Sequence, residues 1–179
     1  MRSILAAVLA FVLLFPLSAE GQIETKSSEI TGSTRLASTD MRVLYSETYP
    51  GRARFRAACE MTETDTTWQV SIYGFVGETS DLSATSDVRV QADGRSVPVQ
   101  SVRSSRRTIN DKILEIKHVV FRRSDFERVA TAEKVFATVG PYRFEFSRVL
   151  RKDLRLILER VPAQKGPRTA SSDSSGSGQ

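Results

Sequence analysis

Arginine and lysine are the residues whose types and spacing in this sequence are best suited to chemistry, and that chemistry is anion recognition. Residues 102–179 contain 17 basic and 9 acidic residues, whereas residues 20–101 contain 8 basic and 12 acidic residues. A guanidinium group donates paired hydrogen bonds to a carboxylate, phosphate or sulfate. The same charge asymmetry also suits a fold whose two halves attract each other. The candidate residues for binding an anionic partner are Arg103, Arg106, Arg107, Arg148, Arg151, Lys152 and Arg155.

Nucleophilic and metal chemistry lack the residues that they need. His118 is the only histidine and Cys59 is the only cysteine, which excludes histidine-based triads and metal sites built on paired histidines. The chain has no G-x-S-x-G motif, no Gly-rich phosphate loop and no C-x-x-C motif. We therefore assign no catalytic, cofactor-binding or metal-binding residue, and we expect the protein not to be an enzyme.

Two acidic segments leave an alternative function open. Two carboxylates about 5–9 Å apart can hydrolyse a glycosidic bond, so an extracytoplasmic hydrolase could use such loop residues. The spacing does not match the D-x-D-x-D pattern of a Ca²⁺ loop. The acidic residues are Glu60, Glu63, Asp65, Glu78, Asp81 and Asp87.

Cys59 and His118 are both expected within strands. Phe55, Ala57, Cys59 and Met61 alternate with mostly polar neighbours, which predicts a buried thiol on an apolar strand face. Pairing between two chains and a reactive free thiol remain alternatives for this cysteine. His118 shares a strand face with Leu114, Ile116 and Val120, which predicts a half-buried imidazole.

The ends of the chain differ from its middle in composition. Residues 1–21 have the form of a signal peptide, with Arg2, an uncharged apolar run over 4–15 and small residues before Glu20 and Gln22. The apolar run is too short to span a bilayer, so we expect no transmembrane span after cleavage and a periplasmic or extracellular location. Residues 22–40 read as a linker and 163–179 as a disordered Ser/Gly tail, which leaves a β-rich domain over 41–162.

Alternating apolar residues predict most of this domain as strands. We expect paired strands over 41–49 and 52–62, and a central strand over 67–76 that is covered on both faces. Residues 88–102 predict a hairpin with a type I′ turn at Asp93-Gly94, which places Val90 opposite Val97 and Val88 opposite Val99. Further strands are expected over 112–121, 134–139 and 142–146.

Two helices complete the expected fold. Ser124 and Glu127 have the spacing of a capping box, and Ser147 caps a second helix over 148–160. In that second helix the apolar stripe lies opposite the basic residues. The sequence thus predicts a mainly β fold, an antiparallel β-sandwich or open barrel with one short helix and one C-terminal helix.

The order of elements after Ile113 resembles the carboxy-terminal pattern of small exported bacterial proteins of uncharacterised function. The pattern is a strand, the helix R-R-S-D-F-E-R-V-A-T-A-E, the hairpin V-F-A-T-V-G-P-Y-R-F-E-F-S and a final helix. The resemblance covers residues 86–160, including the V-R-V-Q-A-D-G-R hairpin. It implies an exported β domain and carries over no functional residue.

These features predict an exported, non-enzymatic binding or envelope-associated domain that recognises an anionic partner through a basic C-terminal surface. The partner would be an anionic polymer, an envelope surface or a protein. Nucleic acid fits less well, because the basic clusters contain no interleaved aromatic residues for base stacking. A structural assembly subunit is a third reading, since Pro98 indicates a sheet edge where strands could pair.

Overall fold

The computed structural model describes residues 23–44, 46–76, 82–109 and 112–161. The signal peptide expected at 1–21 and the tail expected at 163–179 lie outside these described residues. Within them, no helix combines the length and the hydrophobicity that crossing a membrane requires.

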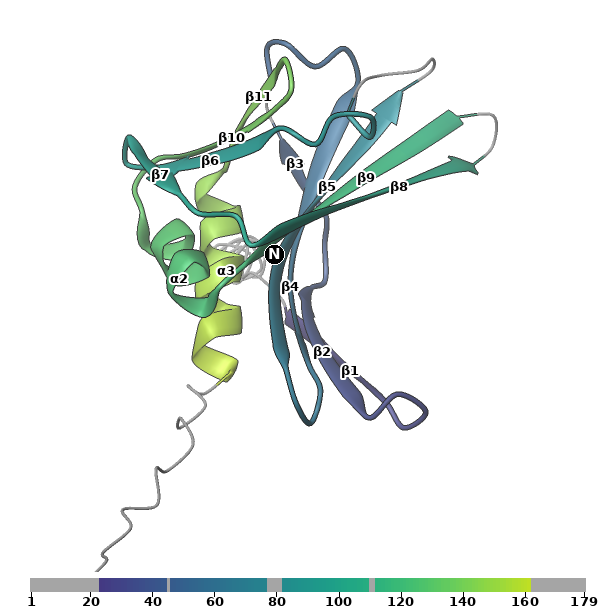
Figure 1. Cartoon of the computed structure of the whole chain (residues 1–179), viewed down its shortest axis with the longest axis vertical. Helices are drawn as coiled ribbons and strands as arrows, with labels where there is room; N and C mark the ends of the chain where they lie inside the picture. The colour runs from purple at the N-terminus through teal and green to yellow at the C-terminus, as the bar shows by residue number, and fades with distance from the viewer. Residues whose placement is uncertain (1–22, 45, 77–81, 110–111, 162–179) are drawn as a thin grey trace, which may run out of the picture.

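Seven strands form the larger of two antiparallel sheets (Figure 1). They are β1 (Ile23–Ser28), β2 (Ser33–Ser38), β3 (Arg42–Leu44), β4 (Arg52–Met61), β5 (Thr66–Val76), β8 (Ser101–Ile109) and β9 (Lys112–Phe121). The order across the sheet is β1-β2-β4-β5-β9-β8, and β3 pairs with the first half of β4. The expected strand pairing across Pro50-Gly51 and the central place of β5 are both confirmed.

The linker expected over 22–40 is wrong, because β1 and β2 form a hairpin that pairs with β4. Three kinds of interaction hold this polar hairpin on the sheet. The side chains of Ile23 and Leu36 are buried in the core, and the Arg56 guanidinium forms an ion pair with Glu24. The Arg160 guanidinium also donates a hydrogen bond to the Ile23 carbonyl across 2.9 Å. Its composition resembles a linker because most of its other side chains face solvent.

The smaller sheet has four strands in the order β11-β10-β6-β7. They are β6 (Val88–Ala92), β7 (Arg95–Val97), β10 (Val135–Val139) and β11 (Tyr142–Glu145). Val90 faces Val97 across the turn, and both turn residues have positive φ, 50° at Asp93 and 75° at Gly94, as expected for type I′. Beyond Val97 the chain leaves β7, the edge strand, and crosses to the larger sheet, so Val88 pairs with Val139 of β10 instead of facing Val99 in this hairpin.

Two helices pack beside the small sheet. The helix α2 (Arg123–Thr131) begins two residues earlier than the capping box predicts, and its N-cap, Arg122, makes no side-chain capping bond. Strand β9 runs directly into this helix, so Ser124 falls within the first turn instead of before it. The expected cap of α3 (Arg148–Arg160) is confirmed, because the Ser147 hydroxyl accepts from the Leu150 amide at 3.2 Å.

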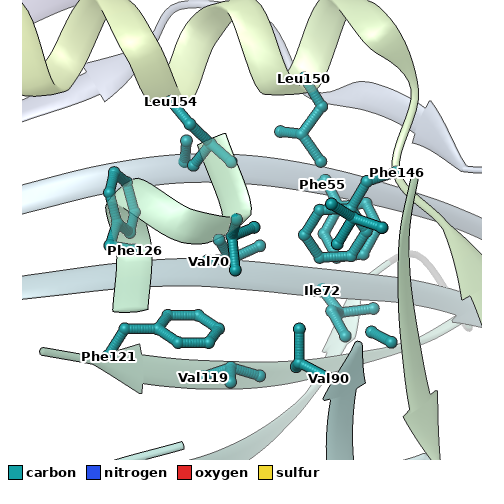
Figure 2. Packing of buried hydrophobic residues seen from close by; sticks show 14 of the residues in the cluster. Phe55, Val70, Ile72, Val90, Val119, Phe121, Phe126, Phe146, Leu150 and Leu154 are labelled. Atoms are coloured by element: carbon teal, nitrogen blue, oxygen red, sulfur yellow. The ribbon is translucent and has the colours of Figure 1, made fainter. Parts of the chain in front are cut away.

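The core lies between the larger sheet on one side and the helices with the small sheet on the other. Figure 1 shows α2, α3 and the four short strands on the same side of the larger sheet. In Figure 2, Leu150 and Leu154 of α3 point toward Phe55 of β4, and Phe126 of α2 lies beside Val70. The fold is therefore mainly β with two helices and resembles a β-sandwich, and the described strands form no closed barrel.

The opposite face of the larger sheet carries no described helix or strand. On β5, Trp68, Val70 and Ile72 point inward and are buried, whereas Tyr73 and Phe75 on the other face are half-buried. The expectation that this strand is covered on both faces therefore holds only in part, since on the second face Ser71 is buried while Tyr73 and Phe75 are half-buried. We call this second face the outer face.

Candidate functional site

The structure divides the seven predicted basic residues between two separate places. Arg103, Arg106 and Arg107 lie on β8, the edge strand at the β9 side of the larger sheet, which the sequence analysis did not assign as a separate strand. The other four lie on α3, which packs against the inner side of the sheet at β4, β1 and β2. The single basic surface predicted from the sequence is therefore not formed.

Strand alternation also separates the three arginines of β8. Arg106 pairs with the buried residue Glu115 and shares its inward face, whereas Arg103 pairs with His118 and Arg107 with Leu114 on the outer face. Only Arg103 and Arg107 can therefore bind a partner together on the outer face.

On α3 the four basic residues differ in exposure. Arg148, Lys152 and Arg155 are exposed and line a shallow hollow with Glu159. Arg151 instead donates to the backbone carbonyl of Glu133 and is partly buried. It thus ties the helix to the segment before β10 and is not free for a partner.

The outer face gathers a second set of arginines that the sequence analysis missed. The segment R-A-R-F-R on β4 alternates, so Arg52, Arg54 and Arg56 point outward while Ala53 and Phe55 enter the core. Three arginines at a spacing of two in an otherwise apolar strand are the signal that could have revealed them. Arg56 is already paired with Glu24, which leaves Arg52 and Arg54 for an external anion.

The strand register sets out this face as parallel rows. Arg54, Tyr73, Ile116 and Ser105 lie side by side across β4, β5, β9 and β8. The neighbouring row is Arg52, Phe75, Leu114 and Arg107. Since β4 and β8 are three strand spacings apart, the arginines stand about 14 Å from each other on either side of an apolar strip. We call these four arginines, Arg52, Arg54, Arg103 and Arg107, with the strip between them, the outer basic face.

Among the described residues, the rows of the outer basic face contain positively charged side chains and no negatively charged one. No described acidic residue lies in the rows of Arg52, Arg54 or Arg103, and no described carboxylate forms an ion pair with Arg52, Arg103 or Arg107. The Arg54 guanidinium lies over the Phe75 ring, 5.8 Å from its centroid. The acidic outward residues Glu24 and Glu60 belong to the far end of the sheet.

His118 stands next to Arg103 on this face. Its Nδ1 atom is 2.8 Å from the Ser71 hydroxyl. Burial, reinforced by the positive charges of Arg35 and Arg103, lowers the pKa of His118 below its ordinary value. The expected half-buried imidazole is confirmed, and burial, with a smaller contribution from the two arginines, favours its neutral form.

A buried polar cluster lies under the inner side of β9. Lys117 is fully buried, and its Nζ donates to Ser104 Oγ at 2.6 Å, to the Ser83 carbonyl at 3.3 Å and to the Thr85 carbonyl. Ser83 in turn donates to Glu115 Oε1 at 2.7 Å. Burial lowers the pKa of Lys117, and the nearby Glu115 opposes that shift. The cluster fixes the segment between β5 and β6 onto β9.

The carboxylates of the alternative reading are dispersed among the described residues. Glu60 is on β4, and Asp65 caps the turn before β5 by accepting from the Thr66 amide at 2.7 Å. Asp87 pairs with Arg89 at 3.1 Å, while residues 78 and 81 lie outside the described part of the chain. No group of three or more potential metal ligands occurs in the part of the chain that is described.

No family model matches this chain, and neither does any curated protein or solved structure. The resemblance to small exported bacterial proteins therefore stays a hypothesis from the sequence.

Proposed function

We propose that this protein is an exported binding domain that recognises an anionic partner through the outer basic face. The observation that carries the proposal is the pair of arginine groups, on β4 and β8, on either side of an apolar strip without a described carboxylate. The backbones of these arginines are fixed on strands of one sheet, so less conformational entropy is lost when they bind a partner with fixed negative charges.

Two of the predicted site residues, Arg103 and Arg107, belong to this proposed surface. Arg148, Lys152 and Arg155 form a separate exposed group on α3 and serve as a matched control. Glu159 lies within that group and weakens its field, whereas the rows of the outer basic face contain no described acidic residue.

Heparin, a sulfated polymer, is a suitable probe for the proposed function. We expect the double variant Arg103→Gln/Arg107→Gln to bind heparin about fivefold more weakly at fixed salt, because two charged contacts are lost. The double variant Lys152→Gln/Arg155→Gln removes the same charge from α3 and should bind almost as the parent does. All four side chains are exposed, so circular dichroism should be unchanged in both variants. Equal losses of heparin affinity in the two variants would mean that net charge alone drives binding and would refute the assignment of the binding site to the outer basic face.

Export, the second part of the proposal, is supported by the sequence of residues 1–21. The exported protein should begin near Glu20 or Gln22, and intact-mass measurement of the exported protein determines this directly. Recovery of the whole chain from the cytoplasm, with Met1 still present, would refute export.

A further inference from the structure

The outer basic face is bordered by exposed aliphatic side chains as well as by arginines. Val43 of β3 is 73% exposed and pairs with Arg54, so it extends the row of Tyr73 beyond β4. Ile109 of β8 is 49% exposed, follows Arg107 on the same face and pairs with Lys112. Two aliphatic side chains that border a positively charged face would gain free energy if an apolar layer covered them.

The positions of these two residues describe a broad surface. Val43 and Ile109 belong to β3 and β8, which are separated by β4, β5 and β9. Four strand spacings correspond to about 19 Å, with the arginines and the strip between the two aliphatic residues. A single polymer chain would cover only part of this width, whereas a broad, deformable anionic surface can follow both edges of the twisted sheet.

The kind of apolar group exposed also favours one partner over others. Phe75, which could stack on a base or a sugar ring, is half-buried and is covered by Arg54. The most exposed apolar side chains of this face are a valine and an isoleucine, whereas Tyr73 and Phe75 are half-buried. Binding at a membrane surface scales with the apolar area that is buried and with the attraction of basic residues to anionic lipids, and this face offers both.

We propose, on the basis of the function proposed above, that the partner is the anionic surface of a phospholipid bilayer. Arg52, Arg54, Arg103 and Arg107 contact lipid phosphates, and Val43 and Ile109 enter the boundary between headgroups and acyl chains. Each arginine near such a surface adds attraction that salt screens, while the aliphatic contribution persists at higher salt.

Vesicle co-sedimentation of the full chain tests this inference. Vesicles of phosphatidylcholine with phosphatidylglycerol are compared with vesicles of phosphatidylcholine alone. Apolar binding that is equal for the two kinds of vesicle, including binding through residues 4–15, drops out of this comparison. We expect at least about tenfold stronger partition to the anionic vesicles. The variant Val43→Ser/Ile109→Ser should reduce that partition about threefold or more while leaving heparin binding unchanged.

Ile30 provides the matched control for the aliphatic residues. It is 99% exposed at the turn between β1 and β2, away from the outer basic face, so Ile30→Ser should partition like the parent. Heparin binding with no preference for anionic vesicles would overturn the lipid inference and leave the proposed function intact. If Arg103→Gln/Arg107→Gln keeps both its partition to anionic vesicles and its heparin binding, the lipid inference and the proposed function are both overturned. An effect of Ile30→Ser equal to that of the double serine variant would also overturn the lipid inference.

Discussion

Arg42 and Asp153 join the first part of the large sheet to the last helix through one hydrogen bond. The Arg42 Nε atom donates to Asp153 Oδ2 at 3.1 Å, between residues 111 positions apart. Asp153 is fully buried on α3, and burial raises the pKa of its carboxyl group while Arg42 opposes that shift. The charge of this aspartate therefore depends on a single arginine from β3.

Replacing Arg42 with alanine should destabilise the fold by about 3 kcal/mol, because an unpaired charge is left inside the protein. Urea unfolding at pH 7 measures the loss. The exposed pair of Arg89 and Asp87 is the control, since Arg89→Ala should cost no more than about 1 kcal/mol. Similar losses in the two variants would show that Asp153 does not depend on Arg42.

The Arg42→Ala defect should also shrink as the pH falls. Without the guanidinium the folded-state pKa of Asp153 rises further above its unfolded value, so the folded state binds the proton more readily. The penalty is present at neutral pH and is lost as the pH falls through that raised pKa. Comparing the unfolding free energies of parent and variant at pH 7 and pH 4 tests the sign, and a defect that grows at pH 4 would contradict it.

Gly94→Val should destabilise the protein by about 1 kcal/mol or more through the backbone alone. A Cβ atom at this position would meet nothing within 4 Å, so the cost comes from φ of 75° and not from a clash. Gly94→Asn should cost less, because asparagine tolerates the left-handed region. Thermal unfolding measures the melting temperatures of the two variants and of the parent. Equal melting temperatures for all three would refute the assignment of a type I′ turn at Asp93-Gly94.

Cys59 should be inert toward thiol reagents in the folded protein. It is fully buried, and burial raises the pKa of its thiol to about 12, so the reactive thiolate is absent at pH 8. Labelling with a chromogenic disulfide should proceed only on addition of denaturant. Rapid labelling of the native protein would show that the strand β4 opens easily.

His118 should titrate below the ordinary pKa of histidine, and its being the only histidine makes the NMR assignment direct. Because the folded pKa is lowered, the unfolded state binds the proton first, so stability is complete above about pH 6.5 and falls as the pH drops through the folded pKa. Arg103→Gln removes one of the cations that lower this pKa and should raise it. An unchanged titration in that variant would place Arg103 away from the imidazole.

Much of the strand content could be predicted because it depends on local rules. The Asp93-Gly94 turn demands a backbone that few residues adopt, and the aliphatic residues of 112–121 favour a strand through their own propensity. The β1–β2 hairpin could not be predicted, because its stability comes from distant partners such as Arg160. The basic surface failed for a related reason: Arg103 and Arg106 are close in sequence, yet strand alternation turns them to opposite faces.

The position of α3 at the end of the folded chain has a consequence for biosynthesis. This helix supplies Leu150, Leu154 and Ile157 to the core, and it covers β4, a strand that the ribosome makes long before it. The small sheet also depends on a later segment, since β6 can pair with β10 only after β10 has been synthesised. A nascent chain therefore cannot close its core until α3 has emerged from the ribosome, and its large sheet stays unpacked until then.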